Sequence, residues 1–62
     1  MKTIYAKVQT KSNYKGLNGE WLLVHQFLGK LVAVKVLDEV TGKMITTDFN
    51  VKEVVEFKEE NN

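Results

Sequence analysis

The sequence predicts an all-β domain built from five short strands. Apolar side chains recur at every second position near the N-terminus and again at Val32, Val34 and Val36, which is the period of a pleated strand. Valine in such a run packs well on a sheet and is a weak helix former. Segments containing glycine separate the runs, as expected of tight turns. With 62 residues, the chain is long enough for one domain with a small core.

The first strand is predicted within residues 1–10, where polar and apolar side chains alternate. Its inward-facing side chains are expected to be Ile4, Ala6 and Val8. Residues 11–19, KSNYKGLNG, combine two glycines, two asparagines and a serine, and therefore predict a loop. The loop is long for a hairpin, so Tyr14 and Leu17 within it are expected to fold back onto the domain.

The apolar stretch 19–38 predicts a β-hairpin that turns at Gly29, because glycine can take the positive φ of a tight turn. Too many polar residues interrupt the stretch for it to span a bilayer. In its first strand, one face is predicted to carry Leu22, Val24 and Leu28. The other face is predicted to carry Trp21, Leu23, His25 and Phe27.

The C-terminal part contains a second turn over residues 38–43, a fourth strand at 44–49, and an ambiguous end. Asn50 followed by Glu53 is a variant of the capping box and predicts one helical turn before a short last strand. The domain is then expected to occupy residues 1–57, with 58–62 as a frayed acidic tail. The alternative is a four-stranded antiparallel sheet closed by a C-terminal helix from Val51 to about Lys58.

The order of these elements resembles an SH3-like barrel. The matching features are Gly16 and Gly19 in the long loop, the Leu22/Val24 strand, Gly29, the alternating valines, and TDFNVKEVVEF at 47–57. The segment GLNGEWLLVHQFLGKLVAVKVLD is similar to a KOW segment, which implies the KOW and chromo-like branch. Members of that branch bind RNA, DNA or protein. The peptide-binding branch uses an Ala-Leu-Tyr-Asp-Tyr segment and a pair of tryptophans. This chain instead has TIYAKVQ and one tryptophan.

The residue inventory argues against catalysis. The chain has one serine, one histidine and no cysteine, and nothing in the spacing of Ser12 and His25 brings the two side chains together. One histidine without cysteine does not make an ordinary zinc site. No glycine motif that cradles phosphate is present in the sequence. We therefore expect a non-enzymatic protein with no cofactor, no metal and no small-molecule substrate.

An aromatic-aliphatic strand face is the first candidate site. It would comprise Tyr5, Trp21, Leu23, His25 and Phe27. If the barrel interior is filled by the opposite face, these side chains form an exposed patch that binds a protein partner or a second copy of the chain. Two alternatives stay open: this face packs inside a bent barrel, and His25 is a partly buried histidine with one satisfied nitrogen.

Lysines of the N-terminal half suggest the alternative function, weak nucleic-acid binding without sequence specificity. Residues 1–35 carry six lysines against one glutamate, a net charge of +5, whereas residues 36–62 carry three lysines against seven acids, a net charge of −4. The candidate contacts are Lys7, Lys11, Lys15 and Lys30. All nine basic residues are lysine, and without arginine the chain lacks the preferred reader of guanine edges. A cytoplasmic location without membrane contact is expected.

Overall fold

The computed structural model describes residues 1–61, and its regular elements are strands and two short 3-10 turns. The strands are β1 (Lys2–Val8), β2 (Trp21–Leu28), β3 (Leu31–Asp38), β4 (Lys43–Asn50) and β5 (Val54–Asn61). The 3-10 turns are η1 (Lys15–Leu17) in the long loop and η2 (Val51–Glu53) before β5. The predicted all-β class is confirmed. Within residues 1–61, no helix has the length and apolar character needed to cross a membrane.

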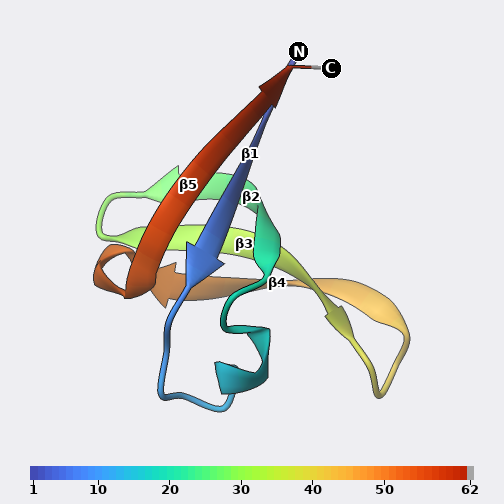
Figure 1. Cartoon of the computed structure of the whole chain (residues 1–62). Coiled ribbons are helices and arrows are strands. Elements are labelled where there is room, and N and C mark those ends of the chain that lie inside the picture. Colours follow the sequence, from blue (N-terminus) through green and yellow to red (C-terminus); the bar gives the residue numbers. More distant parts are fainter. Residues whose placement is uncertain (62) are drawn as a thin grey trace.

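The five strands form one antiparallel sheet in the order β4-β3-β2-β1-β5 (Figure 1). Within the described residues the sheet is not closed by hydrogen bonds, so β4 and β5 are its two edges. The alternative of four strands and a C-terminal helix is wrong, because the chain leaves η2 directly into β5. At the tight turns, Gly29 and Gly42 have φ values of 67° and 73°, which glycine adopts without the strain of a Cβ atom.

β5 is longer than expected and forms a projecting arm with β1. The two strands pair from Lys2 opposite Asn61 to Val8 opposite Val54, whereas β1 pairs with β2 over three residues, Tyr5 to Lys7. The ends of both strands therefore extend beyond the rest of the sheet as a two-stranded ribbon (Figure 1). The predicted frayed tail is corrected for residues 58–61, which are part of β5, and residue 62 lies outside the described residues.

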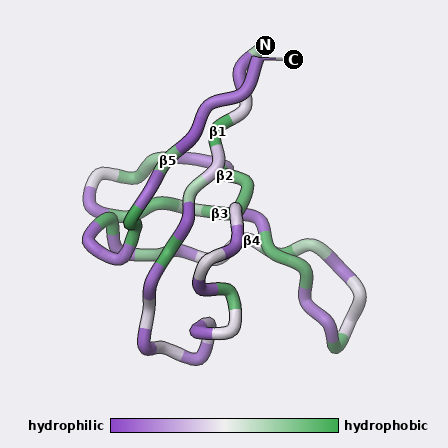
Figure 2. The backbone as a smooth tube through the Cα atoms, in the orientation of Figure 1, coloured by the Kyte–Doolittle hydropathy of each residue, from purple (hydrophilic) through white to green (hydrophobic). Residues whose placement is uncertain are grey.

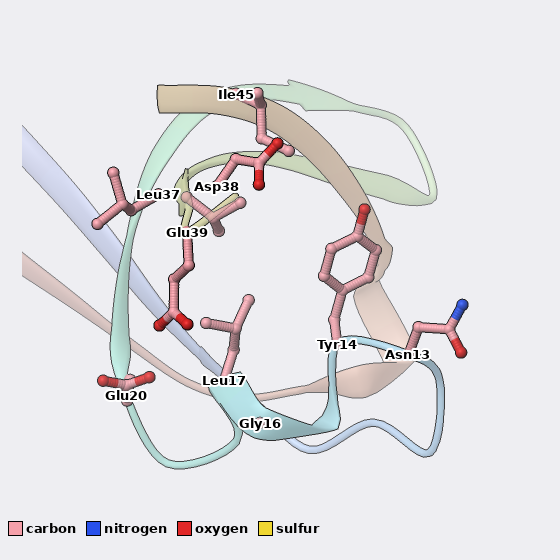
Figure 3. A pocket seen from close by; sticks show the side chains of 10 residues that line it. Asn13, Tyr14, Gly16, Leu17, Glu20, Leu37, Asp38, Glu39 and Ile45 are labelled. Atoms are coloured by element: carbon pink, nitrogen blue, oxygen red, sulfur yellow. The ribbon is translucent and has the colours of Figure 1, made fainter. Parts of the chain in front are cut away.

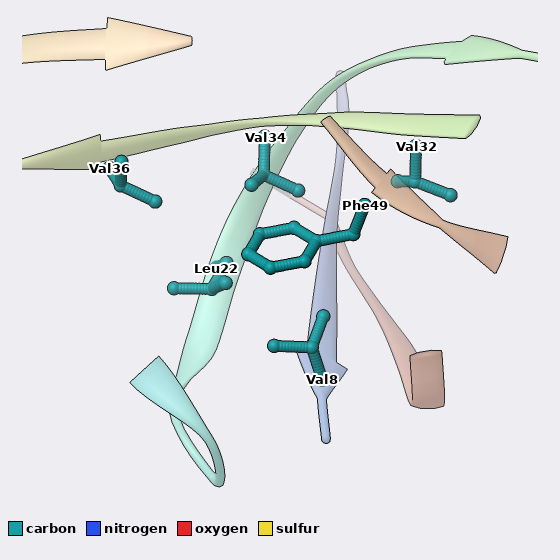
Figure 4. Packing of buried hydrophobic residues seen from close by; sticks show 6 residues of the cluster. All are labelled: Val8, Leu22, Val32, Val34, Val36 and Phe49. Atoms are coloured by element: carbon teal, nitrogen blue, oxygen red, sulfur yellow. The ribbon is translucent and has the colours of Figure 1, made fainter. Parts of the chain in front are cut away.

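The hydrophobic core is small and made mainly of valine. Its cluster of buried side chains gathers between the strands, as Figure 4 shows, and consists of Val8, Leu22, Val32, Val34, Val36 and Phe49. Leu17 packs against this cluster, and the ring of Tyr14 meets Phe49 edge to face at 5.9 Å between centroids. The prediction that the long loop folds back through Tyr14 and Leu17 is confirmed.

A β-bulge at His25 changes which side chains of β2 share a face. Val24 lies opposite Val34, but Gln26 lies opposite the adjacent Ala33, so His25 is an extra, unpaired residue. After the bulge the alternation is reversed, and Phe27 lies opposite the buried Val32. The predicted aromatic-aliphatic strand face is thus wrong at one position, because Phe27 lies on the inner face.

The opposite correction applies to Leu28. The regular alternation predicts that it points inward, but it follows Phe27 and lies opposite Leu31, and both leucine side chains are exposed. We define the inner face of the sheet as the one that carries Ala6, Leu22 and Val34. The outer face is the one that carries Tyr5 and Leu23.

Hydrogen bonds around Thr10 fix the long loop to η2, just before β5. The buried Thr10 hydroxyl donates to the carboxylate of Glu53, and the Thr10 backbone N–H donates to Asn18 Oδ1 at 2.8 Å. The Asn18 amide in turn donates to the Thr10 carbonyl at 2.9 Å. The other oxygen of Glu53 accepts from the Asn50 N–H at 3.1 Å, and Asn50 Oδ1 accepts from the Lys52 N–H. These two hydrogen bonds form the predicted capping box. A loop of this length is held in place by polar contacts as well as by packing.

Val34 provides a test of the inner face. Its side chain is 0% exposed, so Val34→Asp places an unpaired charge in the core at a cost of several kcal/mol. A domain of this size has a total stability near the low end of about 5–15 kcal/mol, and we expect the variant to be unfolded by circular dichroism. Thr46→Asp, exposed on the adjacent strand, adds the same charge and should remain folded. A folded Val34→Asp protein would contradict the assignment of faces.

Glu53 provides a test of the loop anchor. Glu53→Ala leaves the buried Thr10 hydroxyl and the Asn50 N–H without their acceptor, and we expect a loss of about 1–3 kcal/mol in urea unfolding. Glu39→Ala, an exposed glutamate in the β3–β4 turn, removes the same charge and should change stability by less than about 0.5 kcal/mol. Equal losses in the two variants would show that the anchor has no structural role.

Candidate functional site

The outer face carries a row of paired side chains that crosses the whole sheet. Tyr5 of β1 lies opposite Lys58 on one side and Leu23 on the other, and Leu23 lies opposite Lys35. In the adjacent row Lys7 lies opposite Trp21. Because directly opposite residues on one face are about 4.5–5.5 Å apart at Cβ, these side chains form a continuous surface. We call Tyr5, Trp21 and Leu23, with Lys7 and Lys58, the aromatic platform.

Two lysines hold the rings of the platform. The Lys7 ammonium lies 4.4 Å from the centroid of the Trp21 ring, and the Lys58 ammonium lies 4.8 Å from the same ring and 5.2 Å from that of Tyr5. Contacts of this kind are attractive because the face of an aromatic ring is negative. Trp21 and Tyr5 are half-buried, so the rings are positioned by their neighbours and still accessible.

A groove runs from the platform toward the β3–β4 hairpin. It has a volume of about 380 Å³, and beyond the platform it is lined by Leu37 and Met44, which are 57% and 58% exposed. These two residues lie opposite each other in β3 and β4. Three charged residues, Glu20, Lys35 and Glu39, also line the groove. We call this feature the outer groove, and its lining combines apolar side chains with two carboxylates and one ammonium group.

A second hollow lies between the long loop and the β3–β4 hairpin (Figure 3). Its volume is about 440 Å³, and Tyr14 and Leu17 extend toward it from the loop. Its lining includes the carboxylate residues Glu20, Asp38 and Glu39. Because Leu17, Glu20 and Glu39 also line the outer groove, the two hollows meet around the end of β3.

The five residues predicted as a protein interface are divided between locations. Tyr5, Trp21 and Leu23 come together as expected on the outer face. His25 is exposed at the bulge, so the alternative of a partly buried histidine is wrong. Phe27 lies on the inner face, where its ring meets that of Phe57 at 5.8 Å between centroids.

The four lysines predicted to contact nucleic acid lie on different elements. Lys7 is in β1 and covers Trp21, whereas Lys11 and Lys15 belong to the long loop. Lys30 is in the β2–β3 turn, where its carbonyl accepts from Val51 N–H at 2.8 Å. Lys58, in the acidic half of the sequence, is the lysine that joins Lys7 at the tryptophan.

Phe57 and Ile4 form a separate apolar groove with Phe27 on the inner side of the arm. The groove has a volume of about 280 Å³ and is completed by Lys58 and Glu59. Phe27 and Phe57 are 51% and 47% exposed, respectively. Residues 58–61 are all polar or charged, and Figure 2 shows this C-terminal end of β5 as hydrophilic, so Phe57 is an apolar exception beside it.

Sequence reasoning missed Lys58, Leu37, Met44 and Phe57 as surface features. The exposure of Leu37 could have been predicted from the alternation in β3, because its three inward valines place Leu37 on the outer face. Met44 follows from the same hairpin once its pairing with Leu37 is known. Lys58 and Phe57 required the register of β5 against β1, which the sequence does not display.

Ser12 and His25 lie on different elements, the long loop and β2. Ser12 is occupied within the loop, where its hydroxyl accepts from Tyr14 N–H at 3.2 Å and lies 3.1 Å from the Thr10 hydroxyl. Among residues 1–61, no group of three or more histidine, cysteine, aspartate or glutamate side chains is placed to hold a metal ion.

Comparison of the chain with protein-family models, with curated proteins and with solved structures found no match.

Removing the platform lysines should lower stability in a measurable way. Lys7→Gln/Lys58→Gln removes both cations from Trp21 and one from Tyr5, and at about 0.5–1 kcal/mol for each of the three contacts we expect a loss of about 1.5–3 kcal/mol in urea unfolding. Lys30→Gln/Lys43→Gln also removes two charges, from exposed positions outside the platform, and should have a much smaller effect. If the two double variants lose the same stability, the cations do not hold the rings.

Proposed function

We propose that this chain is a non-enzymatic interaction module with an SH3-like barrel fold, and that its outer groove binds a segment of a protein partner. The observation that carries the proposal is the combination of a platform of positioned rings with exposed Leu37 and Met44 in one groove. Large exposed apolar surfaces on a small domain usually mark an interface.

The barrel part of the proposal rests on topology. β2 serves two neighbours in succession, pairing with β1 from Trp21 to Leu23 and with β3 from Leu23 to Leu28. The bulge at His25 bends the strand just after this change of partner. A long first loop and a 3-10 turn before the last strand agree with the SH3-like pattern. These features support a sheet that curls around the valine core.

The chemistry of the groove suggests what the partner segment contains. An apolar side chain would cover Leu23, Leu37 and Met44, where it removes apolar surface from water on both sides. Glu20 and Glu39, which outnumber Lys35 in the lining, favour a neighbouring lysine or arginine in the partner. The platform offers Tyr5 and Trp21, residue types that supply large contact area at low entropic cost. We therefore propose a ligand segment that pairs an apolar anchor with a basic residue.

A peptide-display selection followed by NMR titration tests this proposal. We expect selected peptides to combine an apolar with a basic residue and to shift the resonances of Trp21, Leu37 and Met44. Leu37→Asp should weaken the selected peptides by at least tenfold, because it places a charge on the apolar floor. Val40→Asp is the matched control, since Val40 is 94% exposed at the hairpin turn and does not line the groove.

Two results would contradict the proposal. One is a peptide that shifts residues elsewhere and binds Leu37→Asp as tightly as the unmodified chain. The other is that the selection yields no peptide, while the chain binds a 12-nucleotide single strand with a salt dependence that is weaker in Lys7→Glu. The second result would favour the alternative, a weak nucleic-acid binder in which Lys7 contacts phosphate and Trp21 stacks on a base.

A further inference from the structure

β5 is an eight-residue strand at the edge of the sheet, with no strand beside its outer side within residues 1–61. Such an edge presents backbone groups that can pair with another chain. We propose that β5 pairs antiparallel with β5 of a second copy of this chain, around a two-fold axis at Phe57. This site is separate from the outer groove, and the inference does not depend on the proposed function.

The charges of β5 favour one register. β5 has a bulge at Val55, because Lys7 lies opposite Glu56 whereas the next residue, Val8, lies opposite Val54, so its alternation is regular from Glu56 to Asn61. Within this regular segment a two-fold axis perpendicular to the sheet pairs residues of the same face, so the axis must pass through a residue position. With the axis at Phe57, Glu56 of each copy lies opposite Lys58 of the other, giving two opposite-charge pairs on the outer face. An axis at Glu56, Lys58 or Glu59 instead places two like charges opposite each other.

The apolar surface around the axis supports the same register. Phe57 would lie opposite Phe57 of the second copy on the inner face, beside Phe27, whose ring already meets Phe57 at 5.8 Å. Both rings are about half exposed in the single chain and border the groove that contains Ile4. Aromatic cross-strand pairs are among the stabilising pairs in sheets. Dimerisation would also cover Phe57, the apolar residue beside the hydrophilic C-terminal end of β5.

The other edge strand does not offer an equivalent register. The charged residues of β4 are Lys43 and Asp48, which are separated by five positions and therefore lie on opposite faces of the strand. No two-fold register can place them opposite each other, because paired residues share a face. Charge complementarity therefore favours β5 as the self-pairing edge.

Lys58 links the dimer to the aromatic platform. In the single chain its ammonium lies 3.2 Å from Glu60 and contacts the Tyr5 and Trp21 rings. Glu56 of the second copy would draw the ammonium toward the outer edge of β5. The fluorescence of Trp21 should therefore change as the chain dimerises.

Charge reversal tests the inference. By sedimentation velocity from micromolar to millimolar protein, we expect the unmodified chain to dimerise and Glu56→Lys to weaken dimerisation by about tenfold or more, since two pairs turn from attraction to repulsion. Glu56→Lys/Lys58→Glu restores opposite charges in both pairs and should recover dimerisation to within about threefold of the unmodified chain. A chain that is monomeric throughout, or a Glu56→Lys dimer of unchanged affinity, would overturn the proposal.

Single cysteines test the register independently, since the chain has no cysteine of its own. Phe57→Cys places two thiols at directly opposite positions, about 4.5–5.5 Å apart at Cα, within the range of a disulfide. Under mild oxidation we expect a covalent dimer with Phe57→Cys and little with Glu59→Cys. The opposite outcome would reject the axis at Phe57. Leu37→Asp should leave dimerisation unchanged, so failure of the dimer and failure of the outer groove are distinguishable.

Discussion

The bulge at His25 is the constraint on which the surfaces of this domain depend. β2 carries apolar side chains at both odd and even positions, and a regular strand would place Trp21, Leu23 and Phe27 on one face. One extra residue between Val24 and Gln26 reverses the alternation. Trp21 and Leu23 therefore contribute to the outer platform, whereas Phe27 joins Phe57 on the inner side of the arm. The bulge creates two separate apolar surfaces from a single strand.

A core made mostly of valine explains why those surfaces are exposed. Small domains bury a modest share of their surface, and here the buried cluster holds four valines but only one leucine and one phenylalanine, Leu22 and Phe49. Other large apolar side chains, including Phe27, Leu37, Met44 and Phe57, lie at the surface. The hydrogen bond from Thr10 to Glu53 compensates in part, because it holds the long loop without further apolar burial. The domain thus leaves several large apolar residues at its surface.

Much of the fold could be predicted because its signals are local. The alternating valines, the glycine turn at Gly29 and the Asn50/Glu53 cap each act within a few residues, and all three are present in the structure. The bulge was missed because it depends on which strand β2 pairs with at each point along its length. The surface role of Lys58 was missed for a similar reason, since it depends on the register of β5 with β1.

The most direct test of this account is a NOESY spectrum of the side chains of β2. The reversed alternation predicts cross-peaks between the rings of Phe27 and Phe57, and between the Trp21 indole and the side chains of Lys7 and Lys58. It predicts no cross-peak between Phe27 and Leu23, which lie on opposite faces. Cross-peaks linking Phe27 to Leu23, together with none to Phe57, would show a regular strand and contradict the account.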